Sequence, residues 1–507
     1  MKSRLYPFFA LVLASCAVGP DYRRPAAIAD AATPAAFKEG SEQAQGNWKQ
    51  AQPKDDISRG KWWRIFGDPV HDSLQEQVDI SNQTLVRAEA QYRQAEALVQ
   101  AARSSFFPSL NTNVTSTRSR ASSTTISQPS TVPVSRGVVT NYGLPATVAW
   151  EADVWGHIRR TVEVNRANAQ ASVADLEAVR LLAHAALAQN YFQLRALDSQ
   201  KQLYDETIAA YEKSLKLTQN QYSVGVAAKA DVVQAQAQLK SVQAQSIDLD
   251  VARAQLEHAI ASLIGKAASN FSIPRAPLAI TPPAVPTGLP SELLERRPDI
   301  AGAERRMAAA NAQIGVAKSA FYPVFTLNAS GGFQSSNYGQ WVTTPSRFWA
   351  IGPSIALSLF DGGLRRAQTN QAIAAYDASV ATYRLAVLTG FQEVEDNLAA
   401  LRVLEQEALV QTEAAILAEQ SLALTFNQYK AGTVTYLAVT VVAAAALNSQ
   451  RTSVDILSRR MVASVLLIKA LGGGWNASEL PSADALTRDT YTPVKATSSP
   501  ATPAAKH

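Results

Sequence analysis

The chain contains the same pattern twice, and this internal duplication constrains the fold more than any other feature of its 507 residues. The segment AEAQYRQAEALVQAARSSFFPSL, starting at Ala88, aligns without a gap with AERRMAAANAQIGVAKSAFYPVF, starting at Ala303. Further along, QYSVGV at Gln221 matches QYKAGT at Gln428. We therefore expect two similar structural units, one per half.

Each half contains an unusually long stretch without proline, which favours a long helix. We expect long helices at 159–221 and 364–430, and shorter returning helices at 228–264 and 436–471. Gly225 and Gly432 stand between them, where a left-handed cap can reverse the chain. At 1.5 Å per residue the long helices would span about 95–100 Å. A medium helix is expected earlier in each half, near 71–105 and 291–319.

Apolar residues in these helices recur at steps of three and four, the spacing of a left-handed coiled coil. One such series lies on the first returning helix, with two polar members, Ser246 and Arg253: Leu239, Val242, Ser246, Leu249, Arg253, Leu256, Ile260 and Leu263. The sequence therefore predicts two coiled-coil hairpins. A medium helix and a returning helix together match the length of one long helix, so we expect the two shorter helices to stack beside it.

Two strands are expected between the medium and the long helix of each half. In YGLPATVAWEADV, apolar residues alternate with a polar set formed by Thr147, Glu151 and Asp153. The matching strand carries Trp349 and Ile351 on its apolar face, and the first strand, near 110–119, has the weakest pattern. Spanning sheets must close in lipid, and four strands per chain cannot enclose a pore. Three chains would suffice, with the polar set lining water as the lumen face of the barrel.

The N-terminus has the build of a secretory signal peptide. Lys2 and Arg4 precede an apolar run, and small residues lead to Cys16, the only cysteine in the chain. The sequence LASC resembles the lipobox of bacterial lipoproteins, which implies that Cys16 carries an acyl anchor such as palmitate in the outer membrane. The alternative is an ordinary signal peptide beside a stray thiol.

These patterns divide the chain into six parts. They are a signal peptide (1–15), a lipidated extension (16–70), the first repeat (71–272), a proline-rich linker (273–298), the second repeat (299–475) and a disordered tail (476–507). The expected fold class is mainly α with a membrane β part.

The sequence gives no sign of enzymatic chemistry. The five histidines lack metal-ligand spacing, and GGGW at Gly472 lacks the frame of a phosphate-binding loop. We therefore expect no catalytic residue, no metal and no cofactor other than the acyl anchor. The net charge of +5 comes from interleaved charges rather than a basic patch, so nucleic-acid binding is not expected.

Several motifs together resemble the TolC-like outer membrane factors of tripartite efflux and secretion systems, and most closely their lipoprotein branch. They are CAVGPDYRRP, KWWRIFGDP, LPSELLERRPDI, SAFYP, LFDGG and KALGGGW, spread from Cys16 to Trp475. The resemblance implies a homotrimer with a 12-stranded β-barrel continuous with an α-helical barrel. It also implies a periplasmic adaptor and an inner-membrane pump of the RND type as partners, and outer-membrane lipid around the barrel.

The resemblance also implies roles for the hairpin ends. The tips, which would dock the adaptor, are Val224, Gly225, Val226, Ala431, Gly432 and Thr433. The periplasmic aperture would lie beside the second tip, where relatives often carry aspartates; this chain has Ala438 and Val441 there, while the first repeat keeps Asp231. We expect an apolar aperture formed by Leu437 and Val441, unless both are ordinary coiled-coil residues.

The function expected from these features is an outer-membrane exit duct for drug efflux. A duct for peptide or protein secretion is the nearest alternative. An adaptor would have one hairpin between compact β domains, and a structural lipoprotein rod would not need tryptophan-bearing strands, so both fit less well.

Overall fold

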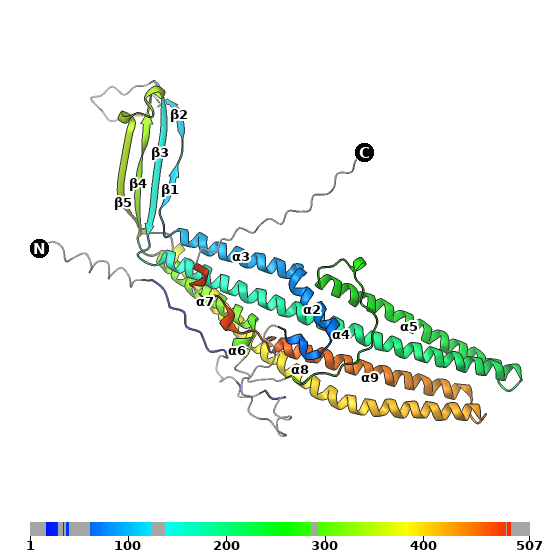
Figure 1. Cartoon of the computed structure of the whole chain (residues 1–507). Coiled ribbons are helices and arrows are strands. Elements are labelled where there is room, and N and C mark those ends of the chain that lie inside the picture. The colour runs from blue at the N-terminus through cyan, green and yellow to red at the C-terminus, as the bar shows by residue number, and fades with distance from the viewer. Residues whose placement is uncertain are drawn as a thin grey trace, which may run out of the picture.

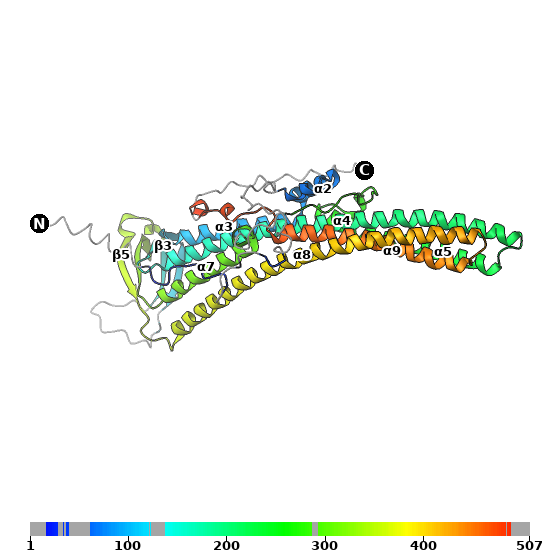
Figure 2. The same cartoon turned by 90° about the horizontal axis from the view of Figure 1, so that it is seen from below.

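The computed structural model describes residues 17–28, 34, 37–39, 61–120, 122, 137–285, 293–482 and 484–487. The molecule is elongated, with a β-sheet standing at one end and two helical hairpins ending at the other (Figures 1 and 2). Its main elements are α2 (Pro69–Ser81), α3 (Gln83–Ser104), β1 (Ser109–Thr112), β2 (Thr115–Arg120), β3 (Val138–Ala152), α4 (His157–Ser223), α5 (Lys229–Leu263), α6 (Leu293–Arg296), α7 (Pro298–Ser319), β4 (Val324–Ser335), β5 (Arg347–Ala356), α8 (Leu364–Lys430) and α9 (Tyr436–Ala470).

The duplication is visible in the lengths of the helices. The long helices α4 and α8 have 67 residues each, and the returning helices α5 and α9 have 35 each. All four begin and end within two residues of the bounds expected from the sequence. Each long helix occupies about 100 Å at 1.5 Å per residue.

The expected medium helix of the first half is two helices. Asn82 separates α2 from α3, because its side chain accepts hydrogen bonds from the backbone N–H groups of Thr84 and Leu85 and so caps α3. Its amide nitrogen also donates to the carbonyl of Leu263 at 2.7 Å, which fixes the break against α5. In the second half the helix likewise divides, at Pro298, into α6 and α7.

The sheet is antiparallel with the order β1–β3–β4–β5, and β2 also pairs with β3. β1 and β2 are one strand interrupted: Thr112 faces Ala146 and Thr115 faces Gly143 in a single continuous register. The interruption lies beside Pro145, which has no N–H to donate to the ladder. The expected four strands are therefore present, the first of them broken in two.

The hairpin helices form a layer in the order α5, α4, α9, α8 (Figure 1). Aromatic residues pack over its middle: Trp63 stacks on His184 with ring centroids 4.3 Å apart, and Phe66 lies 4.8 Å from Phe192. The inter-repeat linker covers the same side, because the Arg195 guanidinium donates to the Pro274 carbonyl at 2.7 Å.

Both ends of the described chain pack against the helices. Residues 17–28 run along α7, where Asn311 donates to the Pro20 carbonyl and Tyr22 donates to Glu304. The expectation of a disordered tail from residue 476 is wrong for 476–482 and 484–487. Leu486 is 4% exposed and packs between Val99 of α3 and Ala169 of α4. Residues 488–507 lie outside the described part.

Candidate channel surface and hairpin tips

The two faces of the sheet differ in polarity as the alternation predicts. Paired residues of antiparallel strands share a face, so Trp150, Leu327, Trp349 and Ile351 lie on one face. They are 38%, 40%, 80% and 65% exposed in the single chain. Large apolar side chains exposed together need a cover, which lipid can provide.

The opposite face of the sheet is polar. Glu151 pairs with Thr326 and Thr147 pairs with Ser330, and the hydroxyl groups of Thr326 and Ser354 are 2.6 Å apart. Thr147 and Glu151 therefore share the polar face of the sheet, as the alternation predicts, and their place in the lumen of a barrel stays a prediction.

Asp153 does not belong to this polar face, contrary to the sequence-based expectation. β3 ends at Ala152, and the Asp153 carboxylate accepts the backbone N–H groups of Ile158 and Arg159 at 3.0 Å each. The Arg159 guanidinium also donates to it at 3.1 Å. The first N–H groups of a helix have no partner within the helix. The Asp153 carboxylate therefore turns towards the start of α4 and does not follow the alternation of β3. Asp361 and Arg365 form a comparable pair in the second repeat.

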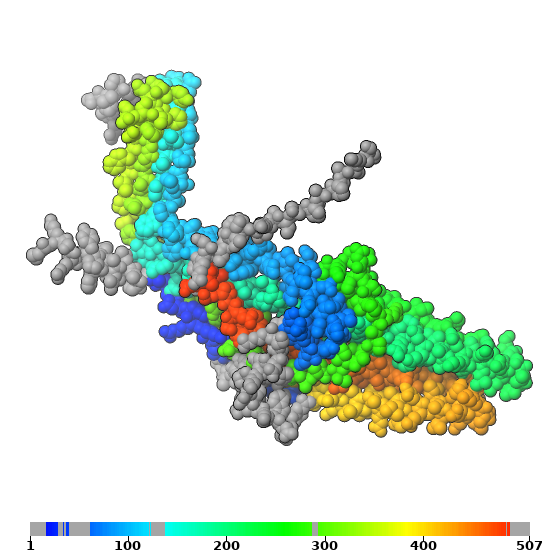
Figure 3. Space-filling model, viewed as in Figure 1, coloured from blue at the N-terminus to red at the C-terminus, as the bar shows by residue number. Residues whose placement is uncertain are grey.

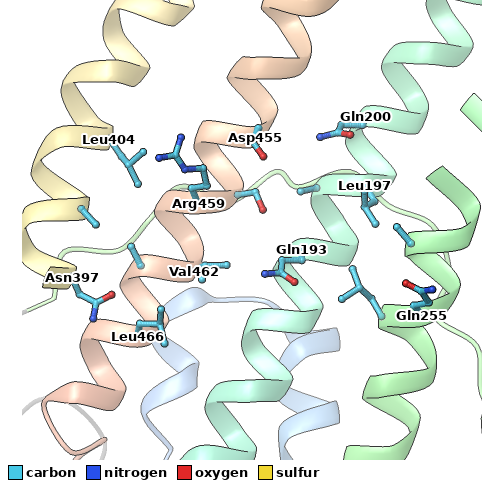
Figure 4. Close-up of a pocket in the computed structure, with 16 residues that line it drawn as sticks. Gln193, Leu197, Gln200, Gln255, Asn397, Leu404, Asp455, Arg459, Val462 and Leu466 are labelled. Atoms are coloured by element: carbon cyan, nitrogen blue, oxygen red, sulfur yellow. The ribbon is translucent and has the colours of Figure 1, made fainter. Parts of the chain in front are cut away.

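The helical layer has an open face opposite the linker. On α4, Arg195, Asp198 and Ser199 contact the linker, whereas Gln193 and Gln200 line a broad hollow of about 680 Å³ on the other side. Figure 4 shows Gln193, Gln200, Gln255 and Asn397 turned into this hollow, with Asp455 and Arg459 of α9 beside them.

Neutral amides are the most numerous polar side chains of this open face, which they share with alanine, leucine and valine side chains, and sequence reasoning did not identify them. The heptad spacing of α9 would have related this surface to the aperture candidates. Val441 and Asp455 are separated by two heptads, so they lie on the same side of the helix. The aperture candidates and the amide-lined hollow therefore face the same way. Such a surface can hydrate passing molecules without binding one charge strongly.

The hairpin tips have the same backbone geometry in both repeats. Gly225 and Gly432 have φ of 79° and 73°, a left-handed conformation that suits glycine. The N–H of Val226 donates to the Gln221 carbonyl at 2.8 Å, and that of Thr433 donates to the Gln428 carbonyl at 3.0 Å. These bonds close each helix with a Schellman turn.

The tips lie at the far end of the molecule (Figure 3) and leave apolar side chains exposed. Val224 and Val226 are 73% and 74% exposed, and Ala431, Gly432 and Thr433 are exposed as well. Exposed valines on a rigid turn form a compact surface that a partner can contact.

The aperture candidates lie on two different helices. On α9, Leu437 and Val441 are 59% and 61% exposed, whereas Ala438 is half-buried. The Asp231 carboxylate of α5 already has a partner in its own helix. It accepts a hydrogen bond from the backbone N–H of Ala228 at 3.3 Å, as an acidic residue in the first turn of a helix often does.

Three further findings concern the acyl anchor, metal binding and membrane-spanning helices. Cys16 lies outside the described residues. Among the described residues no group of three or more histidine, cysteine, aspartate or glutamate side chains could hold a metal ion. Within the same residues, every helix is too short or too polar to cross a membrane by itself.

Comparisons with known proteins agree with this geometry. The family model described as "Outer membrane efflux protein" matches residues 74–266 and 289–473. The chain is 29% identical to the pyoverdine export outer membrane protein OpmQ of Pseudomonas aeruginosa, over 88% of this chain and 94% of that protein. It is 30% identical to the solvent efflux pump outer membrane protein SrpC of Pseudomonas putida, over 94% and 100%. The solved outer-membrane channel OprN superimposes with a TM-score of 0.80 at 29% identity, over 91% and 100%.

Proposed function

The chain belongs to the outer membrane efflux protein family and is an outer-membrane efflux channel, and from this premise we propose that it is the passive exit duct of a tripartite pump. In this proposal an inner-membrane pump, of the RND type, supplies the energy, and a periplasmic adaptor joins that pump to the duct. The duct conducts the cargo across the outer membrane without chemical change.

One observation carries the proposal: a two-faced sheet stands at one end of a long helical body whose other end exposes two matched tips (Figure 1). The sheet suits a bilayer, because one face is apolar and the other is polar. The helical body, about 100 Å long, suits the space below the membrane.

The two edges of the helical layer support the proposed homotrimer. Val403, Val410, Leu417 and Leu424 recur every seven residues along α8 and are 49–71% exposed. At the opposite edge, α5 exposes Val233, Ile247 and Val251 by 54–68%. Two exposed heptad stripes on opposite edges support a ring in which α8 of one chain packs against α5 of the next.

The position of the described N-terminus supports an acyl anchor at Cys16. The N–H of Val18 donates to the carbonyl of Trp155 at 3.0 Å, at the junction of β3 and α4. Residue 17 therefore stands at the foot of the sheet, on the level where lipid would begin. An acyl chain two residues before Val18 can reach the bilayer there.

Leu437 and Val441 are the proposed aperture residues, with Ala438 between them. Three copies of this apolar pair would close the tube by packing and by excluding water. Asp231, which caps α5, is the remaining candidate for an acidic contribution from the first repeat.

In-cell cross-linking from the tips tests the duct and its partners together. Single cysteines at Val226 and Thr433 should capture an adaptor, whereas a cysteine at Ile80, 78% exposed on α2 and far from the tips, should not. Capture together with a proton-driven pump supports drug efflux. Capture together with an ATP-driven exporter supports the alternative, a secretion duct for peptides or proteins.

If a folded trimer captures no adaptor from either tip, the docking assignment is wrong. The anchor has a separate test: Cys16→Ser, exported by an ordinary signal peptide, should remain in the outer-membrane fraction because the barrel holds it. Its release into the periplasm would contradict the barrel.

A further inference from the structure

A cavity of about 370 Å³ lies between the two hairpins, about four helical turns from the Gly225 tip. All four hairpin helices contribute to its wall. Its floor is made of buried side chains from α4 and α9: Tyr211, Ser214, Tyr436, Val439, Thr440 and Ala443.

The cavity lies where two apolar clusters of the helical layer meet. Tyr211 and Ala443 of its wall belong to one cluster, and Tyr436 and Val439 belong to the other. Side chains in protein interiors normally fill such a space. An unfilled volume this large between two packed clusters can admit a molecule without displacing either of them.

The Tyr211 hydroxyl is buried in this wall and has no hydrogen-bond partner among the described residues. Tyr211 itself is 8% exposed. Burial raises the pKa of Tyr211, and the nearby Gln238 side chain, which lines the same cavity, lowers it in the manner of a hydrogen-bonding group. The Gln238 amide nevertheless lies outside the distance and angle limits of a hydrogen bond to this hydroxyl. Leaving a buried hydroxyl unpaired is costly, so a ligand oxygen placed here would satisfy it.

The other polar groups of the cavity are already engaged or lie at its edge. The Tyr436 hydroxyl accepts a hydrogen bond from Ser214 at 3.4 Å, and the Thr440 hydroxyl donates to the Tyr436 carbonyl at 3.2 Å. The charged side chains, Lys213 and Glu419, are exposed at the rim, and Glu419 accepts a hydrogen bond from Gln450. The interior therefore offers apolar contact, aromatic rings and one free hydroxyl.

We propose that this cavity is a binding site for a small uncharged aromatic molecule with one hydrogen-bonding oxygen, held between the hairpins by the hydroxyl of Tyr211. A cavity of about 150 Å³ accommodates benzene, so the larger volume here fits a molecule of two fused rings. The ligand would contact α4 of one hairpin and α8 and α9 of the other, and would thereby stabilise their present spacing. The site lies within one chain and requires neither assembly nor transport.

Calorimetric titration of the full-length protein in lipid nanodiscs tests the site, with 2-naphthol and naphthalene as probes. We expect saturable binding of 2-naphthol at one site per chain. Tyr211→Phe removes only the hydroxyl, so it should weaken 2-naphthol binding about fivefold and leave naphthalene binding unchanged. Ala443→Phe fills the cavity and should abolish binding of both probes.

Ala444→Phe is the matched control, because Ala444 is the next residue on α9 but is exposed. It adds the same ring to the same nanodisc and should leave both affinities unchanged, which also corrects for probe dissolved in lipid. Equal binding to Ala443→Phe and the wild type would overturn the site. Equal 2-naphthol affinity of Tyr211→Phe and the wild type would overturn the role of the hydroxyl, even if Ala443→Phe failed to fold.

Discussion

Asp198 is the residue on which the attachment of the inter-repeat linker depends most. Its side chain is 1% exposed; it accepts hydrogen bonds from Arg253 at 2.7 Å and from the backbone N–H of Ala276 at 3.2 Å. Arg195 lies 3.4 Å away and also holds the linker. Burial makes this network sensitive, because an arginine left without its partner keeps the full cost of desolvation.

We therefore expect Asp198→Ala to lower the free energy of unfolding by about 3–5 kcal/mol. Asp250→Ala provides the matched comparison, since Asp250 pairs with Arg275 at 2.6 Å but both side chains are nearly half exposed. It should cost about 1 kcal/mol or less. Chemical denaturation followed by helix circular dichroism measures both, and equal losses would contradict the argument from burial.

His71 gives the fold a dependence on acid. It is fully buried, and burial lowers its pKa to about 4, with Asp68 acting in the opposite direction and His184 in the same one. Below about pH 6.5 the His71 imidazole binds a proton in the unfolded chain, whereas in the folded chain it stays neutral until the pH approaches 4. Stability should therefore fall as the pH drops from about 6.5 towards 4.

Between pH 7 and pH 5 this effect should amount to about 2 kcal/mol. His71→Phe should flatten the dependence of the melting temperature on pH over this range. His258→Phe, at an exposed histidine of α5, should leave it unchanged. An unaltered acid dependence in His71→Phe would show that other groups cause it.

At the scale of elements, local patterns predicted the helices of the hairpins well. A 3.5-residue period and a glycine at each tip are properties of the segment itself, so α4, α5, α8 and α9 follow from the sequence. The break at Asn82 was missed because half of its cause, the Leu263 carbonyl, comes from another helix. The packing of Leu486 depends on a groove between α3 and α4 that no local pattern reveals.

The candidate site likewise contains features that a local pattern predicts and features that depend on packing between distant segments. Alternation predicted that Thr147 and Glu151 share the polar face of the sheet, as they do, since a strand has period two. It failed at Asp153, where the strand ends and the helix takes the carboxylate. The amide-lined face and the Tyr211 cavity were not predicted, because both depend on how two hairpins far apart in the sequence lie together.

The ordered segment after Trp475 should stabilise the junction of α3 and α4. Leu486→Ala should cost about 2–4 kcal/mol because it opens a cavity beside Val99, and limited proteolysis should then cut within 476–487. Glu479→Ala, at an exposed position of the same segment, should remain resistant. Equal cleavage of both variants would indicate that Leu486 does not hold the segment.

At the scale of the whole molecule, the two edges of the helical layer should meet in the trimer. In the duplication, Val410 of α8 corresponds to Leu203 of α4. The two residues after Leu203, Tyr204 and Asp205, form hydrogen bonds with Gln245 and Ser246 of α5. Val410 and Ile247 therefore stand at similar heights on opposite edges.

A chain carrying Val410→Cys and Ile247→Cys should form disulfide-linked dimers and trimers under oxidation, which non-reducing electrophoresis would separate. Each single-cysteine variant measures the disulfides that the introduced cysteine forms with Cys16 or with another copy of itself. Pairing Val410→Cys with Leu182→Cys, exposed on α4, should give no ladder. A ladder from that pair, or none from Val410 with Ile247, would contradict the proposed ring.

The segment 17–28 has a mechanical consequence. Its partners run in the opposite direction along α7, from Asn311 beside Pro20 to Glu304 beside Tyr22, before Arg24 reaches the hydroxyl of Tyr383 on α8 at 3.0 Å. A force on residue 17 along the helix axis loads these bonds in shear, so they share the tension rather than failing one after another. Arg160 joins the same segment to the first repeat through Asp21 at 2.9 Å, so the tension spreads over both halves of the chain.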